Sequence, residues 1–379
     1  CCCNGAAGSR FNRCRRPNGP LCSGSPESRS NHLEFLKRSW GWLKWPAALG
    51  VLAWLYYTNQ TALREIAGAP KSWGYLCGAL LLIGTACVLT FFRWYLLVRA
   101  QQFPFRFRDA LRLGFIGLVA NYVAPGAVGG DIVKAFLMAR GQTSRRTAAV
   151  ATVVLDRILG MLALVMVGAI VALFPSTTLD HPQLQSVGRF MWAGTAAGLV
   201  GLWLMLTPAI THAPWIRRLE KLPKVGHMLG ELVHGVELYQ SRPATVVLAL
   251  LISLAGHGGL IAGFYLCALW MKQPWVPDLL THFYFMPTAE LFGAFVPVPA
   301  GMGALEGAVQ WFYERLKPET VTAEAAAAAG FMAAIAFRLV QLVIAAAGGG
   351  YYITARGEIA SAMHEAEEAQ HEPVPESTL

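Results

Sequence analysis

Long apolar stretches recur along this chain of 379 residues and constrain its fold more than any other feature. A helix needs about 20 predominantly apolar residues to cross the hydrocarbon core of a bilayer. Six stretches meet this need, some of them marginally: 43–59, 75–98, 147–174, 189–208, 243–270 and 324–353. Charged residues make up only 14% of the chain, against about 25% in soluble domains, which excludes a disordered protein and argues against an ordinary soluble enzyme. We therefore predict an all-α, polytopic transmembrane helical bundle.

Two further apolar stretches, 109–140 and 277–316, are interrupted by Pro and Gly. Each consists of two apolar halves that are too short to cross a bilayer alone. Lipid cannot satisfy the polar groups of a broken backbone, so each break must be buried in protein or line a wet cavity. We predict that both stretches fold as re-entrant helical hairpins. The alternative for each is one kinked spanning helix.

The basic residues indicate a topology. The net charge is +9, and most Lys and Arg residues lie in short connections between apolar stretches. Such residues favour the cytoplasmic side of a membrane. With both termini cytoplasmic and neither hairpin crossing, the external loops hold only Arg64, Lys71, Arg189, Lys272, Arg315 and Lys317. This asymmetry supports six spans plus two hairpins.

The same order of elements occurs twice, as span, span, hairpin, span. The first membrane repeat covers 43–174 and the second covers 189–355. An odd number of crossings inverts one half relative to the other, which is a layout found in transporters. Outside the repeats we expect a disordered basic leader at 1–42, an external loop at 175–188 and a frayed or disordered acidic cytoplasmic tail at 356–379. Within the second repeat, we expect residues 214–240 to form an amphipathic cytoplasmic segment.

Charged and polar residues within the apolar spans are the first candidates for function, because charge at membrane depth is costly. The candidates are Asp156, Arg157, Glu290, Arg338 and Gln341. The alternative is a purely structural role, in which Asp156 or Glu290 neutralises an arginine on another helix. Arg93 lies near the cytoplasmic end of its span, where its side chain can reach the interface, so it is not a candidate. His257 is interpreted as a buried hydrogen-bonding residue.

The hairpin breaks provide the second group of candidates: Asn121, Pro125, Gly126, Gly129, Gly130, Asp131, Lys134, Pro299, Gly301, Gly303 and Glu306. Helix starts after such breaks attract anions, including phosphate. Asp131 and Glu306 either cap these helix starts or take part, with the cations, in binding a zwitterionic headgroup. No P-loop, HExxH, GxSxG or dinucleotide-binding motif occurs. We therefore expect no enzymatic activity, cofactor or metal site, and no nucleic acid as a partner.

Two pairs of sequence strings carry a family resemblance. NYVAPGAVGGDIVKAFLMAR, followed by VVLDRILGML, resembles the first signature of the flippase-like membrane proteins. FVPVPAGMGALEGAV, followed by AFRLVQLV, is similar to their second signature. This family includes the transmembrane region of lysylphosphatidylglycerol synthase, the multiple peptide resistance factor, and the resemblance covers about residues 43–355. The resemblance implies a functional role for all of the candidates above except Lys134, Glu290 and Gln341. Asp156 stands where the family more often has Glu.

The resemblance implies a protein of the bacterial inner membrane that handles polar lipids, either phospholipids or polyprenyl lipids. The sequence shows no synthetase region, so we expect that a separate lipid synthetase or glycosyltransferase is its partner. The leading hypothesis is a lipid flippase in which Arg157 and Arg338 contact phosphate, while Asp131 and Glu306 contact an amine or carry a coupling proton. The alternatives are a secondary transporter of a small soluble ion or metabolite, and a non-transporting membrane partner of a lipid-modifying enzyme. The oligomeric state is not predicted.

Overall fold

The long apolar stretches form long helices in the computed structural model, which describes residues 53, 57, 64, 68, 71–123, 129–140, 145–174, 182–211, 213, 226–273, 275–296 and 298–371. Within these residues, five helices are long and apolar enough to cross a membrane. They are α2 (Trp73–Ala100), α5 (Arg146–Val171), α6 (Pro182–Leu206), α10 (Pro243–Trp270) and α13 (Ala323–His371). The prediction of a polytopic helical bundle is therefore confirmed. The predicted first span, 43–59, lies almost entirely outside the described residues.

Each interrupted apolar stretch forms two short helices. The first gives α3 (Phe107–Val123) and α4 (Gly129–Arg140), and the second gives α11 (Leu279–Phe295) and α12 (Ala304–Leu316). A short 3-10 turn at Pro299–Gly301 precedes α12. The two helices of each pair pack against each other, so neither stretch is a single kinked helix. We call these pairs hairpin one (α3 and α4) and hairpin two (α11 and α12).

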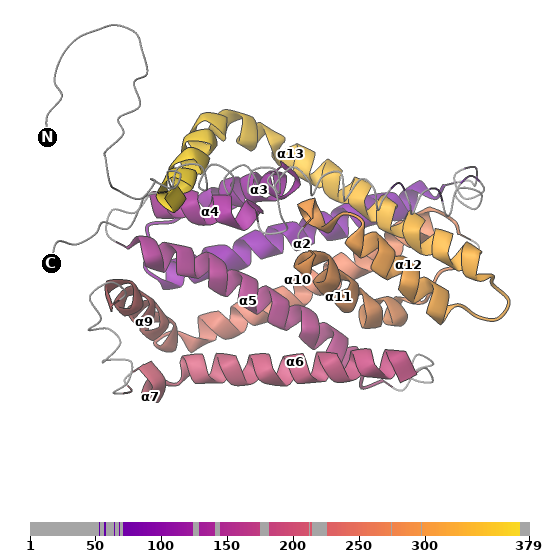
Figure 1. Cartoon of the computed structure of the whole chain (residues 1–379), viewed down its shortest axis with the longest axis horizontal. Helices are drawn as coiled ribbons and strands as arrows, with labels where there is room; N and C mark the ends of the chain where they lie inside the picture. The colour runs from indigo at the N-terminus through magenta and orange to yellow at the C-terminus, as the bar shows by residue number, and fades with distance from the viewer. Residues whose placement is uncertain are drawn as a thin grey trace, which may run out of the picture. The chain divides into compact units, whose positions relative to one another are not determined.

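The helices α2 and α10 lie side by side in the middle of the bundle (Figure 1). Glycines allow this close approach. A Cβ added to Gly259 would lie 3.6 Å from the Leu82 carbonyl oxygen, and one added to Gly263 would lie 2.5 Å from the Ile83 side chain. Helices in membranes commonly associate through such small residues, because hydrophobic driving force between helices is weak in lipid.

The remaining helices pack in matching ways around this central pair. Hairpin one contacts α13 through α3 and α5 through α4, while hairpin two contacts α5 through α11 and α13 through α12. The lengths also match, since α2 and α10 have 28 residues each, and α3 and α11 have 17 each. This arrangement brings the breaks of both hairpins toward α2, α5, α10 and α13, where the cavity described below lies.

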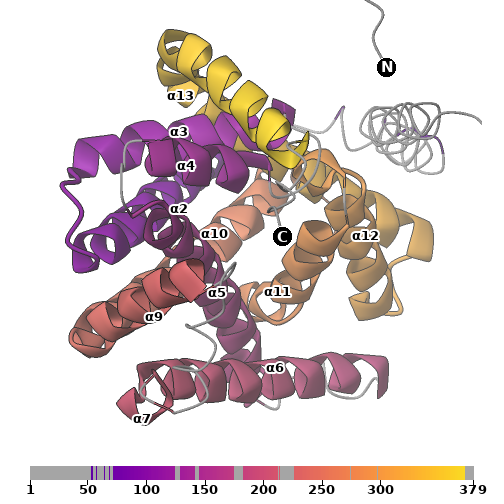
Figure 2. The ribbon, with the colours of Figure 1, turned by 60° about the vertical axis from the view of Figure 1, so that its left-hand side comes forward.

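The predicted amphipathic segment 214–240 contains α9 (Gly226–Gln240), and its earlier residues lie outside the described part of the chain. This helix packs against α5, α6, α10 and the short α7 (Pro208–Thr211). Figure 2 shows α9 beside α5, with α6 and α7 below it. The Tyr239 hydroxyl donates to the Leu97 carbonyl oxygen at 3.1 Å, and Gln101 Nε2 donates to the Gly235 carbonyl oxygen at 2.7 Å. Burial raises the pKa of the Tyr239 phenol, which keeps it neutral and able to donate.

The last helix is longer than expected. We expected the acidic tail from residue 356 to be frayed or disordered, but α13 continues without interruption to His371, so this expectation is wrong for 356–371. The physical reason is composition. These residues are rich in Ala and Glu, which are among the best helix formers, and they extend a helix that is already nucleated.

Candidate functional site

A cavity of about 380 Å³ lies where the two hairpins meet α2, α5, α10 and α13. Its lining includes nine of the sixteen residues predicted from the sequence to bind substrate: Asn121, Asp131, Lys134, Asp156, Arg157, Glu290, Gly301, Arg338 and Gln341. These residues come from distant parts of the chain, and the fold brings them together around one space. The two sequence signatures therefore contribute to a single site.

A buried ion pair joins α2 to α5 at one side of this cavity. Arg93 Nε donates to Asp156 Oδ1 at 2.7 Å, and Arg93 Nη1 donates to the Ser253 hydroxyl on α10 at 2.8 Å. The side chains of Arg93 and Asp156 are only 6% and 5% exposed. The expectation that Arg93 reaches the membrane interface is therefore wrong. It lies seven residues before the end of α2, about 10 Å inside the helix at 1.5 Å per residue.

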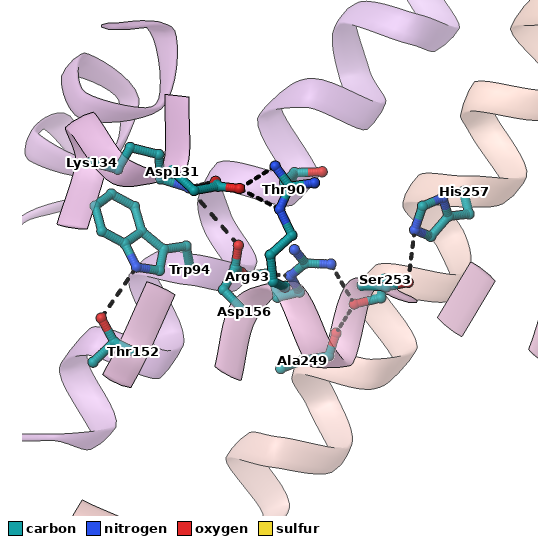
Figure 3. A network of polar contacts seen from close by, with 12 residues as sticks. Thr90, Arg93, Trp94, Asp131, Lys134, Thr152, Asp156, Ala249, Ser253 and His257 are labelled. Carbon is teal, nitrogen blue, oxygen red and sulfur yellow. Dashed lines mark hydrogen bonds and ion pairs between the residues drawn. The ribbon is translucent and has the colours of Figure 1, made fainter. Parts of the chain in front are cut away.

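Asp131 and Lys134, one turn apart on α4, extend this network (Figure 3). Asp131 accepts from Arg157 on α5 and lies 3.8 Å from Lys134 Nζ. Lys134 Nζ is also 3.9 Å from Asp156 Oδ2 and lies 4.5 Å from the centre of the Trp94 ring. This cation–π contact helps to hold a lysine whose side chain is only 8% exposed. Arg157 differs from the others because 45% of its side chain is exposed.

The break of hairpin one is held by a side chain and by close backbone packing. Asn121 Oδ1 accepts from the Gly130 amide at 2.8 Å, which satisfies a free amide at the start of α4. A Cβ added to Gly130 would lie only 2.0 Å from the Gly117 carbonyl oxygen, so the two helices can meet here only through glycine. Gly129 is buried beside it, while Pro125 and Gly126 lie outside the described residues.

The break of hairpin two places Glu306 in two interactions at once. Its Oε2 accepts from the Gly303 amide at 2.7 Å, and its Oε1 accepts from Arg338 Nε on α13 at 2.8 Å. The capping role and the charged role, considered as alternatives from the sequence, are therefore combined in one carboxylate. Arg338 Nη1 is also 3.5 Å from Gln341 Oε1.

Glycine is required in the turn before α12. Gly301 and Gly303 have φ values of +67° and +83°, which residues with a side chain rarely adopt. A Cβ added to Gly301 would also lie 2.5 Å from the Gly293 carbonyl oxygen. Pro299 begins the 3-10 turn that leads into these glycines. The predicted glycines therefore shape the backbone of the break, and Gly301 also lines the cavity.

His257 on α10 and Glu290 on α11 lie beside each other in the lining of the cavity. His257 Nε2 lies 3.0 Å from the Gly160 carbonyl oxygen, which fits the prediction of a buried hydrogen-bonding histidine. Its Nδ1 is 3.7 Å from Glu290 Oε2. Neither His257 Nδ1 nor Glu290 Oε1 has a hydrogen-bond partner among the described residues.

The two halves of the chain contribute equivalent acid–arginine pairs. Asp131 is the third residue of α4 and Glu306 is the third residue of α12. Each carboxylate contacts an arginine on the next span, Arg157 for the first pair and Arg338 for the second. Both arginines line the cavity, one from each half. Guanidinium groups, with their planar forks of donors, are suited to binding phosphate.

Electrostatically, the network is balanced. Arg93, Lys134, Arg157 and Arg338 oppose four carboxylates, those of Asp131, Asp156, Glu290 and Glu306. The part of the chain that the structure describes contains no group of three or more His, Cys, Asp or Glu residues able to hold a metal ion. Arg93, Ser253 and Trp94 are the members of the network that the sequence reasoning missed. The signal that would have identified Arg93 is a carboxylate within another apolar span, Asp156, which needs a cation as its partner.

Comparison with known proteins identifies the family. A search of curated proteins found no significant match to the chain. The sequence model described as "Lysylphosphatidylglycerol synthase TM region" matches residues 42–349, which is most of the chain and includes every described residue of the cavity. The chain therefore belongs to the family of the lysylphosphatidylglycerol synthase transmembrane region.

Proposed function

We propose that this membrane protein binds the polar headgroup of a phospholipid or polyprenyl lipid in the cavity and moves the lipid between the two leaflets. In this proposal Arg157 and Arg338 bind the headgroup phosphate, and the acyl or prenyl chains stay in the bilayer. The proposed activity is transport and involves no catalysis. The proposed location is the bacterial inner membrane, with both termini cytoplasmic.

The observation that carries the lipid assignment is the position of Arg157 on the outside of the bundle. Its side chain is 45% exposed, and its neighbours along α5, Val154, Ile158 and Met161, are exposed apolar residues, as is Ile132 beside Asp131 on α4. Apolar side chains on the outside of a membrane bundle are suited to contact with lipid chains. Both Arg157 and Met161 also line the cavity, so the charged site is continuous with this apolar surface. A soluble cargo would instead favour a polar vestibule closed off from lipid.

The repeated pairs support a mechanism of alternating access. The pairs Asp131–Arg157 and Glu306–Arg338 occupy matching places in the two halves, as expected for an inverted repeat whose broken helices meet around one binding site. We propose that both hairpins are re-entrant and that rocking of the halves exposes the cavity to each leaflet in turn. A carboxylate beside each arginine suits a headgroup that carries an amine as well as a phosphate.

Reconstitution in liposomes tests this proposal. Fluorescent phosphatidylglycerol is placed in both leaflets, and a membrane-impermeant reductant then quenches the outer leaflet. The wild-type protein is expected to expose the protected inner pool, and the double variant Arg157→Lys, Arg338→Lys is expected to do so at least about tenfold more slowly, because lysine keeps the charge but loses the planar fork. Arg189→Ala is the control, since Arg189 is an exposed arginine bonded to Ser186 outside the cavity.

The outcomes separate the proposal from its alternatives. Wild-type rates equal to those of protein-free liposomes would refute lipid transport, and wild-type rates in the double variant would refute the assignment of the two arginines. A parallel arm uses glycerophosphoglycerol, which has the same phosphodiester without acyl chains. Its uptake without lipid movement would indicate a transporter of soluble anions. Co-purification of a lipid synthetase, with neither activity in isolation, would indicate a non-transporting partner.

A further inference from the structure

The His257–Glu290 pair is a titratable site inside the cavity that the proposed headgroup contacts do not use. Its two residues come from different helices, and both line the cavity. Their side chains are mostly buried, with 20% and 14% exposed. By position along helices of equal length, the equivalent residues in the first half are Cys87 on α2 and Leu118 on α3, so this pair occurs only once in the matched helices.

The hydrogen bond at Nε2 fixes the tautomer of the neutral imidazole. A carbonyl oxygen can only accept, so the 3.0 Å contact with the Gly160 oxygen requires a proton on His257 Nε2. The neutral ring then presents a bare lone pair at Nδ1. This lone pair faces Glu290 Oε2 at 3.7 Å, and an ionised carboxylate is also only an acceptor. Two facing acceptors cannot bond to each other, whereas one added proton turns the contact into an attractive imidazolium–carboxylate pair.

In the described part of the chain, the surroundings supply no hydrogen-bond partner to His257 Nδ1 or to the other carboxylate oxygen, Glu290 Oε1. Both atoms are buried. Burying a polar atom without a partner is costly, and a proton on His257 Nδ1 would let this atom interact with Glu290 Oε2. With Nε2 bonded to a carbonyl oxygen, Nδ1 is the free basic atom of the ring, so the geometry makes His257 Nδ1 the atom that receives the proton.

Other charged and titratable groups face the same cavity from the helices packed around α10 and α11. They are Cys87 and Arg93 on α2, Tyr122 on α3, Asp131 and Lys134 on α4, Asp156 and Arg157 on α5, and Arg338 on α13, which is paired with Glu306 on α12. Without His257 and Glu290, the network has four cations and three carboxylates. An ionised Glu290 beside a neutral His257 makes it neutral, and one proton makes it positive by one charge. Because charges interact more strongly inside a protein than in bulk water, one added positive charge is expected to strengthen anion binding in the cavity.

We propose that His257 and Glu290 form a one-proton binding site whose occupation strengthens binding of an anionic phosphate headgroup in the same cavity. The headgroup half of this inference rests on the proposed function, while the proton half stands on the geometry of the pair alone. By linkage, the headgroup strengthens proton binding by the same factor as the proton strengthens headgroup binding. Such a coupling would let a proton gradient bias the direction of lipid movement.

Proton binding is measured first, without lipid cargo. The protein is labelled with ¹⁵N-histidine, placed in phosphatidylcholine nanodiscs and followed by NMR from about pH 8 to about pH 5.5, the range in which histidine ordinarily titrates. We expect the His257 signal, identified by its loss in His257→Gln, to change from the neutral Nε2–H form to imidazolium. In Glu290→Gln, which removes the facing charge, this change is expected to move to lower pH. A His257 ring that keeps one charge state over this range, or that titrates identically in Glu290→Gln, would overturn the proposal.

Headgroup binding is measured next with dihexanoyl-phosphatidylglycerol, whose phosphodiester keeps its charge over this range. Wild-type affinity is expected to be about tenfold higher at the acidic end than at the basic end, a typical coupling strength, and both variants are expected to lose most of this dependence. His234→Gln is the matched control, because His234 is an exposed histidine on α9 outside the cavity. Equal affinities at both ends of the range would overturn the coupling. Absence of lipid binding at either end would refute the proposed function, leaving the proton site to the NMR result.

Discussion

The buried pair of Arg93 and Asp156 gives the sharpest prediction about stability. In Asp156→Asn the size of the side chain is kept, but its negative charge is lost. Arg93 and Lys134 both lie within 4 Å of this carboxylate, and their side chains are 6% and 8% exposed. The variant therefore leaves one buried guanidinium without its anion and an ammonium with only Asp131, at 3.8 Å. Breaking a buried ion pair by removing one partner costs about 3–5 kcal/mol, and we expect a loss of this size in the free energy of unfolding.

A matched control comes from the neighbouring carboxylate. In Asp131→Asn the main partner that loses its anion is Arg157, whose side chain is 45% exposed and can be solvated. Lys134 keeps Asp156, so no buried cation is left alone. Exposed ion pairs contribute about 0–1 kcal/mol, and we expect Asp131→Asn to cost at most about 1 kcal/mol. The two variants make the same chemical change, so a difference between them reports the burial of the partner.

The measurement is equilibrium unfolding of the purified protein in mixed micelles, followed by tryptophan fluorescence. A third variant, Arg93→Met with Asp156→Leu, replaces both charges by apolar groups of similar size. We expect it to be more stable than Asp156→Asn, because no uncompensated buried guanidinium remains and Lys134 still contacts Asp131. Equal losses for Asp156→Asn and Asp131→Asn, or a double variant less stable than Asp156→Asn, would refute the reasoning.

Two further predictions concern the hairpin breaks. Gly130→Ala places a Cβ 2.0 Å from the Gly117 carbonyl oxygen, so we expect a loss of about 1–3 kcal/mol or more in the same unfolding measurement, whereas Gly307→Ala, with no atom within 4 Å, should stay near wild type. Glu306→Gln keeps an acceptor for the start of α12 but loses the charge facing Arg338, so we expect a loss of about 1.5–3 kcal/mol. Wild-type stability in either Gly130→Ala or Glu306→Gln would contradict the packing or the pairing described for it.

Much of the architecture is predictable because a bilayer leaves few choices. Apolar length predicts the five described spans, and the Pro and Gly residues at 125–130 and 297–303 predict two broken segments. The scarcity of charge at membrane depth also identifies most of the charged residues that line the cavity. These inferences need only local information, since each concerns how one segment meets the requirements of lipid.

Partner choice is not predictable in the same way, because it depends on which helices the fold brings together. The sequence indicates that Asp156 and Arg157 are important, yet Asp156 pairs with Arg93 on α2 and Arg157 pairs with Asp131 on α4. Arg93 was excluded on its distance from a helix end, an argument that ignores a carboxylate on a neighbouring helix. For Glu306, capping and ion pairing seemed to be alternatives, but a carboxylate has two oxygens and the structure uses both.

Comparing the two halves separates what is repeated in the cavity from what is not. The acid–arginine pair occurs in both, as Asp131–Arg157 and Glu306–Arg338. Under the proposed function, a site that holds its cargo while open to either leaflet would use such a repeated element. The buried Arg93–Asp156 pair occurs once, since Phe337 precedes Arg338 where Asp156 precedes Arg157.

The His257–Glu290 pair also occurs once, with Cys87 and Leu118 at the equivalent positions. Under the proposed function, an element present in one half responds differently in the two orientations of the protein, because only one hairpin carries it. A proton taken up at His257 would therefore act on the hairpin that holds Glu290 and leave hairpin one without a corresponding charge change. Repeated residues would then determine what is bound, and single-copy residues would determine in which direction it moves.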